Sequence, residues 1–230
     1  MSIDASDIAE LLTELAARGL VFCSEKDFQL HLAWAMKARG WDLSLEYDPQ
    51  CFDANAAIDI LVHNPKRVAI ELKYKTAQFA AKVFGRSLTL KKHGAQDLAR
   101  YDFLRDIWRI EHLVGKRQVE CGFAIFLTND SSYWRVGRSG TADEMFRVFD
   151  GRSVVGGMLQ WGSQANQGTM RKREKPISLT HDYVFGWKDY WQQEQKNGVF
   201  RYLMVEIEPS RAESSPAMGN ISGTCGDFSA

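Results

Sequence analysis

The stretch from Ala57 to Lys75, AIDILVHNPKRVAIELKYK, constrains the fold more than any other part of the chain. Two alternating apolar runs flank turn-forming residues at 64–66, a pattern typical of a β-hairpin. We expect its strands at 57–63 and 67–74. Charged residues nevertheless interrupt runs that otherwise suit a buried sheet, namely Asp59, Glu71 and Lys73.

The expected turn decides which residues of the two strands face each other. With a turn made of residues 64–66, antiparallel pairing places Asp59 directly opposite Glu71. Because side chains alternate along a strand, Lys73 shares the face of these two carboxylates. The other face carries the apolar residues Ile58, Ile60, Val62, Val68, Ile70 and Leu72. We interpret the apolar face as core and the charged face as a candidate site.

Two opposed carboxylates need a partner that relieves their repulsion. Like charges directly opposite on neighbouring strands destabilise a sheet, unless a proton, a cation or solvent intervenes. Mg²⁺ typically binds one or two carboxylates, keeps several waters and accepts phosphate oxygens, so it suits Asp59 and Glu71. The alternative is an ordinary solvated face, on which Lys73 neutralises one of the two acids.

The rest of the chain alternates between helical and strand patterns. Helices are expected at 4–18, 24–39 and 95–114, and further strands at 42–47, 119–128 and 201–208. The strand at 119–128 is apolar on both faces, which indicates a central position in a sheet. We interpret residues 131–208 as a small antiparallel extension and the Gly- and Ser-rich residues 209–230 as a disordered tail.

Size and composition favour one intracellular domain. A chain of 230 residues with 45% hydrophobic content can bury one sizeable core, so we expect a single domain over 1–208, with a core at about 20–130. No apolar run approaches bilayer length, and the four cysteines lack paired spacing. These features predict a soluble cytoplasmic protein without a membrane partner.

The order of these elements and charges resembles the PD-(D/E)xK nuclease superfamily, which has the restriction-endonuclease-like fold. Asp59 matches its first acid, and Glu71 and Lys73, after eleven intervening residues, match its E-x-K. Glu25, at the start of the second helix, matches the helix acid often found in the family, whereas Ile58 replaces the eponymous proline. The resemblance covers about 20–130 and implies an α/β fold with an αβββαβ core, whose mixed central sheet is flanked by helices.

The resemblance also implies a mechanism. Asp59, Glu71 and the backbone carbonyl of Leu72 would hold Mg²⁺, or Mn²⁺ as a substitute, with Glu25 acting through water. Lys73 would position the attacking water or the scissile phosphate, with Gln96 on the next helix assisting. Hydrolysis of a phosphodiester would leave a 5′-phosphate and a 3′-hydroxyl.

A basic segment is the predicted contact for nucleic acid. No acidic residue occurs between Glu71 and Asp97, so this connection could bind phosphates, or could be a solvated loop. The predicted contacts are Lys75, Lys82, Arg86, Lys91, Lys92 and Arg100. For Arg100, pairing within its own helix is an equal alternative. A second acid-free run, 161–173, is interpreted as a surface loop, and Trp34, Trp108, Trp187 and Trp191 as core residues.

The sequence thus predicts a Mg²⁺-dependent endonuclease with DNA as the favoured substrate. Because one site cuts one strand, cleavage of a duplex would require a homodimer or two events. The first alternative is a catalytically silent nuclease-like module for nucleic-acid binding or assembly. The second is a small-molecule or protein-interaction domain in which the motif occurs by chance.

Overall fold

The computed structural model describes residues 3–52, 57–83 and 85–209. The predicted tail lies outside these ranges from residue 210 onward. The main elements are α1 (Ala5–Ala17), α2 (Glu25–Ala38), β1 (Asp42–Tyr47), β2 (Ile58–Asn64), β3 (Val68–Lys75), α3 (Gln96–Gly115), β6 (Cys121–Thr128), β11 (Trp187–Gln192) and β12 (Val199–Ile207). Their order confirms the predicted helices and strands of the N-terminal half to within a few residues.

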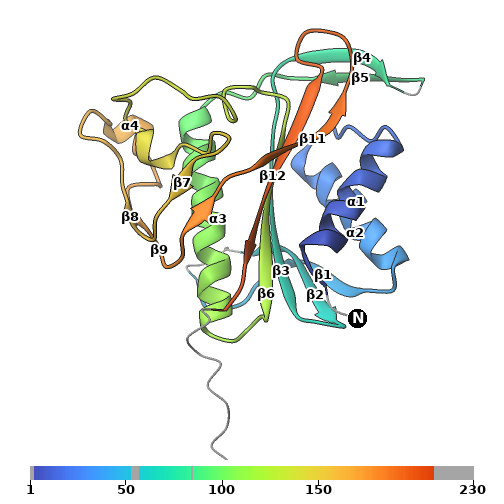
Figure 1. Cartoon of the computed structure of the whole chain (residues 1–230), viewed down its shortest axis with the longest axis horizontal. Coiled ribbons are helices and arrows are strands. Elements are labelled where there is room, and N and C mark those ends of the chain that lie inside the picture. The colour runs from blue at the N-terminus through green and yellow to red at the C-terminus, as the bar shows by residue number, and fades with distance from the viewer. Residues whose placement is uncertain (1–2, 53–56, 84, 210–230) are drawn as a thin grey trace, which may run out of the picture.

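Six strands form a mixed central sheet in the order β1-β2-β3-β6-β12-β11 (Figure 1). The neighbours β3 and β6 are parallel and are connected through α3, whereas all other neighbouring pairs are antiparallel. The pairs between β2 and β3 are Ile60–Ile70, Leu61–Ala69 and Val62–Val68, which is the expected register. The ladder ends one pair before Asp59 and Glu71, and this early end shapes the candidate site.

Helices cover both faces of the sheet. In Figure 1, α1 and α2 lie on one side of the strands and α3 on the other. Ile60 and its even-numbered neighbours pack beneath α1 and α2, while Leu61 and Ala69 pack beneath α3. The charged face of the hairpin is therefore covered by a helix, so the expectation of a single core face was wrong.

Ile58 also departs from the predicted alternation, because it packs in the α3 cluster and not with Ile60. The cause lies in the neighbouring strand, where Glu46 has a left-handed φ of 51°. This residue separates the pair Leu45–Ile60 from the pair Tyr47–Ile58. The local rotation turns Tyr47 and Ile58 toward α3, against which both pack.

The remaining elements are short. They are β4 (Phe79–Val83), β5 (Arg86–Leu90), the 3₁₀ turn η1 (Glu144–Phe146), β7 (Ser153–Val154), β8 (Gly157–Leu159), α4 (Gln167–Met170), β9 (Ile177–Leu179) and β10 (Tyr183–Val184). Three two-stranded antiparallel ladders, β4-β5, β7-β10 and β8-β9, stand apart from the main sheet. The predicted small antiparallel extension is thus present in part, but its last two strands, β11 and β12, complete the central sheet.

Two predictions about single segments need correction. The basic connection after β3 contains the β4-β5 hairpin and is not a plain loop. Among the tryptophans predicted to be core residues, Trp187 is buried, Trp108 and Trp191 are half-buried, and Trp34 is 73% exposed on the outer side of α2.

Within the described ranges, no helix combines the length and the apolar character needed to cross a bilayer.

A close approach between β6 and its neighbours depends on Gly122. A Cβ at this position would meet the side-chain Cγ2 of Ile110 and lie 2.7 Å from the backbone carbonyl oxygen of Ala69. We expect Gly122→Ala to lower the free energy of unfolding by about 2 kcal/mol, because backbone cannot move aside as a flexible side chain can. Urea unfolding would measure this loss. Gly186→Ala is the control, since no atom lies within 4 Å of a Cβ built there, and an equal effect of both variants would contradict the argument.

Candidate active site

The candidate site lies where β3 continues beyond the end of its ladder with β2. Backbone N–H groups of alternate residues point to the same edge of a strand, so those of Leu72 and Tyr74 follow Ile70 toward the β2 side. Beyond the last pair with β2, carboxylates accept hydrogen bonds from these N–H groups. Asp59 Oδ2 accepts from Leu72 N at 2.7 Å, and Glu25 Oε2 accepts from Tyr74 N at 2.8 Å. Two acids predicted from the sequence are thereby fixed against the backbone of β3.

The first turn of α2 brings Glu25 to this edge. The helix begins there because the Ser24 side chain caps it, accepting from Asp27 N at 3.1 Å. One turn further, buried Gln29 donates from Nε2 to the backbone oxygen of Asp59 at 2.6 Å and to Glu46 Oε1 at 2.7 Å. Gln29 therefore holds the backbone of Asp59 in place.

Helix α3 supplies the other wall of the site, with two residues that the sequence motif does not include. Lys73 Nζ lies 3.0 Å from Asp106 Oδ2, and Arg109 NH1 lies 2.9 Å from Glu71 Oε1. Arg109 NH2 also donates to the backbone oxygen of Ala57. Asp106 and Arg109 are both buried, and together they neutralise much of the charge that β3 carries toward α3.

The signal for Asp106 and Arg109 was present in the sequence. In a helix whose inner positions are mostly apolar, Asp102, Asp106 and Arg109 recur at helical spacing on one stripe. Charged residues on the covered side of a helix need partners, because burying an unpaired charge is costly. The stripe therefore indicated a polar partner on the facing sheet.

Burial raises the pKa values of three carboxyl groups at the site. Burial, reinforced by the carboxylates of Asp106 and Glu25, raises the pKa of Asp59 to about 6, although the hydrogen bond from Leu72 N opposes the shift. Burial and the Asp106 carboxylate also raise the pKa of Glu71 well above its ordinary value, against the guanidinium of Arg109. Burial raises the pKa of Asp106, with Lys73 opposing. For Lys73, burial acts to lower the pKa, but Asp106 and Glu25 outweigh it and raise the pKa.

The carboxylates do not yet form a complete metal site. Over the described ranges, no three His, Cys, Asp or Glu side chains come close enough to hold one metal ion together. Glu71 faces Arg109, and Asp59 faces the backbone of Leu72. The predicted ligand set is therefore gathered at one edge of β3 without converging on one point.

The donors present nevertheless fit a hard divalent cation. Asp59 and Glu71 offer carboxylate oxygens, and the carbonyl of Leu72 points to the same edge as its N–H. Among the described residues, Glu71 Oε1 is a buried atom without a hydrogen-bond partner, since Arg109 is within ion-pair distance but not aligned for a hydrogen bond. Burial, together with neighbouring carboxylates, raises the pKa values of Asp59 and Glu71, and a bound cation would favour their ionised forms.

Two other predicted residues lie in different environments. Gln96 Nε2 donates to Asp130 Oδ2 at 3.2 Å, just after the end of β6, and among the described residues it forms no hydrogen bond with Asp59, Glu71 or Lys73. Arg100 is only 5% exposed and pairs with buried Asp143 at 2.6 Å. Arg100 is therefore not free to contact a phosphate in this conformation, and the equal alternative, a pairing within its own helix, was also wrong.

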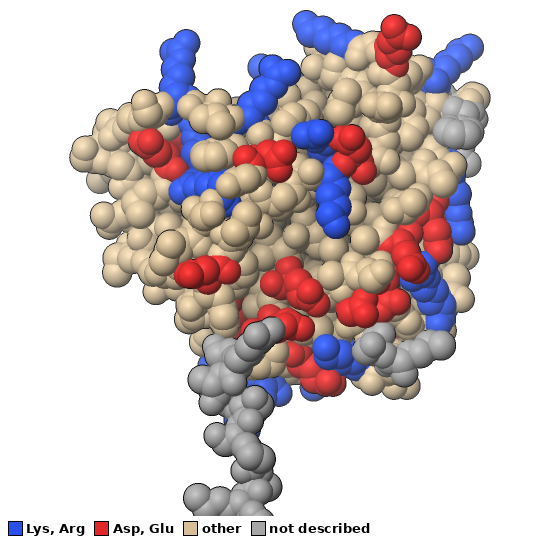
Figure 2. Space-filling model, viewed as in Figure 1, with Lys and Arg blue, Asp and Glu red and all other residues tan. Residues whose placement is uncertain are grey.

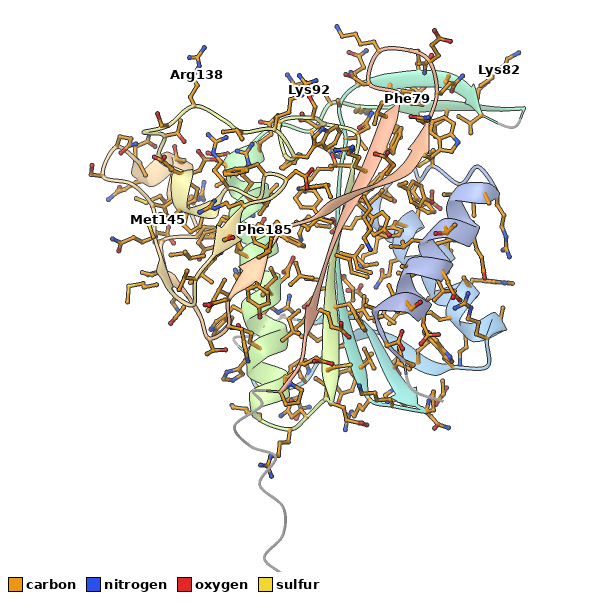
Figure 3. The ribbon with its side chains drawn as sticks, in the orientation of Figure 1. Phe79, Lys82, Lys92, Arg138, Met145 and Phe185 are labelled. Atoms are coloured by element: carbon orange, nitrogen blue, oxygen red, sulfur yellow. The ribbon has the colours of Figure 1, made fainter. Side chains whose placement is uncertain are left out.

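The other predicted phosphate contacts lie at the end of the molecule to which β3 leads. Lys82, Lys91 and Lys92 are exposed and Lys75 is half-buried, while the side chain of Arg86 lies outside the described part. In Figure 2, extended Lys and Arg side chains project from the upper edge. Figure 3 shows Lys82, Lys92 and Arg138 pointing outward there. Within the described residues none of these three forms an ion pair, so all are available to an anionic partner.

Comparison with models of protein families found no match, and comparisons with curated proteins and with solved structures found none either.

The pKa of Asp59 predicts a cost in stability that depends on pH. Because the pKa rises from 3.8 to about 6 on folding, the ionised carboxylate destabilises the fold at high pH, and protonation removes this cost as pH falls. We expect Asp59→Asn, which keeps an acceptor for Leu72 N, to raise the free energy of unfolding by about 3 kcal/mol at pH 8 in EDTA. The gain should shrink below pH 6 and disappear near pH 4.

Urea unfolding across this pH range measures the effect. Asp42→Asn is the matched control, because the pKa of exposed Asp42 is lowered by Lys37 and its loss should not stabilise the fold at pH 8. A variant Asp59→Asn that is no more stable than the native chain at pH 8 would contradict the prediction.

Proposed function

We propose that the chain is a metal-dependent nuclease that hydrolyses phosphodiester bonds, with DNA as the favoured substrate. The observation that carries the proposal is the gathering of Asp59, Glu71 and Lys73 where β3 continues beyond its ladder with β2, with Glu25 beside them. A fold gains nothing in stability from gathering four carboxylates, of which Glu71 and Asp106 are buried, around only two cations. Such a cluster is typical of a site whose charge serves chemistry.

The topology supports a restriction-endonuclease-like core. The order α2-β1-β2-β3-α3-β6, with β3 and β6 parallel, is the αβββαβ order that the motif resemblance implies. The motif acids sit on β2 and β3, and the additional acid sits on the helix before them. The β-strand pair and the helix thus carry the matched residues in the order expected for the PD-(D/E)xK superfamily.

In the proposed mechanism, Asp59, Glu71, the carbonyl of Leu72 and, through water, Glu25 would hold Mg²⁺. When bound, the ion supplies an activated water and stabilises the charge that develops on the phosphate. Lys73 carries its charge at the same edge of β3 and would orient the attacking water or a phosphate oxygen. Asp106 holds the ammonium of Lys73 in place at 3.0 Å, and Gln29 holds the backbone of Asp59.

A second candidate is a catalytically silent nucleic-acid-binding module. The ion pair between Arg109 and Glu71 favours it, because a guanidinium can neutralise this carboxylate without a metal. Under this alternative, the basic end of the molecule binds nucleic acid and the acids at the edge of β3 serve only to cap Leu72 and Tyr74. The two candidates differ in whether cleavage occurs and whether it requires Asp59.

The proposal is tested by incubating supercoiled plasmid, linear single-stranded DNA and RNA with the protein and Mg²⁺ or Mn²⁺. We expect cleavage of DNA that stops with EDTA. Asp59→Asn and Lys73→Ala should each lower the rate by at least about 100-fold, since each removes a group that acts on the reacting phosphate or its metal. The controls Asp42→Asn and Lys188→Ala alter exposed residues away from the site and should leave the rate unchanged. Undiminished cleavage by Asp59→Asn would refute the assignment, and binding without cleavage in every metal would favour the silent module.

Arg109 offers a test of metal binding that does not depend on activity. We expect Arg109→Gln to lower the free energy of unfolding in EDTA by about 3 kcal/mol, because Glu71 loses its buried counter-ion. Mg²⁺ should then stabilise this variant more than it stabilises the native chain, since the ion would bind a more negative site. Thermal unfolding with and without Mg²⁺ measures both effects.

The matched control for this measurement is Arg105→Gln, one turn earlier on α3. Within the described residues, Arg105 forms no ion pair, so its Mg²⁺ response should equal that of the native chain. If Mg²⁺ stabilises Arg109→Gln no more than the native chain, then Glu71 is not a metal ligand.

A further inference from the structure

A groove of about 750 Å³ runs along α3 beside the candidate active site. Its walls come from three segments, namely one side of α3, residues 50–52 before β2, and residues 172–177 of the C-terminal part of the chain. Arg109 belongs to both places, since it lines the groove and pairs with Glu71. The groove therefore lies next to the acids of β3 and is built partly by residues beyond the nuclease-like core.

The lining of the groove is strongly basic. It contains Arg105, Arg109, Lys172 and Lys175, with Glu174 as the acidic residue among them. Within the described part of the chain, neither Arg105 nor Lys172 forms an ion pair. Their charge is available to an anionic ligand, and phosphate is the anion that such a cluster suits.

An aromatic platform accompanies these cations. Trp108 lines the groove and is half-buried, and its ring is supported by Phe52 at 5.9 Å and His112 at 5.6 Å between centroids. Every nucleic-acid base has a face that can stack on an aromatic ring, and a groove that combines stacking with cations is typical of sites for single strands. A cavity of this size fits a ligand of one or two nucleotides and not a duplex.

The outer wall of the groove is held firmly against α3. Arg173 donates two hydrogen bonds to the carboxylate of Asp102, both at 2.6 Å. Trp161 Nε1 donates to the backbone oxygen of Arg173 at 2.8 Å, and the Tyr101 hydroxyl donates to that of Lys175 at 2.7 Å. The run 161–173, expected to be a surface loop, is thus anchored, and the groove is formed before any ligand arrives.

We infer that this groove binds a short single-stranded segment of nucleic acid, with phosphates against Arg105 and Lys172 and a base on Trp108. The inference rests on the proposed function, because it assigns the groove to the strand that the active site would cut. It gives the C-terminal part of the chain a role in choosing substrates with unpaired nucleotides. Duplex DNA would contact only the basic end of the molecule that carries Lys82 and Lys92.

The test measures binding without cleavage. Fluorescence anisotropy in EDTA would follow a short labelled single-stranded oligonucleotide, the same sequence as a duplex, and a mononucleotide as competitor. Trp108→Ala should weaken single-strand binding roughly 5- to 150-fold, as expected for one stacked base, and Trp108→Phe should retain most of it. Arg105→Glu and Lys172→Glu should weaken it and reduce the slope of log Kd against log salt by about 0.7 for each phosphate that is no longer neutralised.

Two variants serve as matched controls. Trp34→Ala removes an exposed tryptophan from α2, and Lys188→Glu reverses an exposed lysine on β11, both away from the groove. Neither should change single-strand affinity, and none of the groove variants should change duplex affinity. Thermal unfolding of each variant confirms that it is folded.

The outcomes separate this inference from the proposed function. If the groove variants bind single strands like the native chain while cleavage still requires Asp59, the proposed single-strand site is wrong and the proposed nuclease activity is supported. If the groove variants lose single-strand binding but no metal supports cleavage, the single-strand site is supported and the proposed nuclease activity is wrong. Displacement of the oligonucleotide by equal concentrations of the mononucleotide would overturn the assignment to a strand.

Discussion

The structure of the site depends on the point at which two paired strands separate. The ladder between β2 and β3 ends at Ile60 and Ile70, while β3 continues to Lys75. The backbone N–H groups beyond this point need acceptors, because an unpaired buried donor is costly. Asp59 and Glu25 provide them. Consequently, two acids from different elements are held at fixed positions along β3, and α2 is tied to the edge of the sheet that it covers.

The same arrangement opposes stability through its charge. Four carboxylates lie near one another and are faced by two cations, Lys73 and Arg109. Burial, reinforced by the neighbouring carboxylates, raises the pKa values of Asp59 and Glu71. Natural folds accept such conflicts mainly at functional sites, where the rest of the core compensates for them. Here the compensation comes from two large apolar clusters, one on each face of the sheet. The apolar core therefore stabilises a polar site whose own charges lower the stability of the fold.

Sequence patterns predicted the part of the fold in which pattern and packing agree. The turn at 64–66 predicted the register of β2 and β3, because one face of each strand is strictly apolar. The strand β11, WKDYWQ, was missed because an edge strand with exposed charges lacks a clear apolar face. The helical spacing of Asp106 and Arg109 marked them as charges on the covered side of α3, but local periodicity does not show that their partners are Lys73 and Glu71 on a distant strand. Arg100 was misassigned for the same reason, since Asp143 comes 43 residues later.

The position of β12 in the sheet has a consequence for how the chain must be made. β6 pairs on one side with β3 and on the other with β12, and the short elements from η1 to β11 lie between β6 and β12 in the sequence. During synthesis, β6 therefore emerges well before its second neighbour and keeps an open hydrogen-bonding edge for that time. Because β6 is buried and apolar throughout, this edge would be a template for other nascent chains. β12 thus covers the free edge of β6, and this protection against aggregation arrives only after the segment between the two strands has been made.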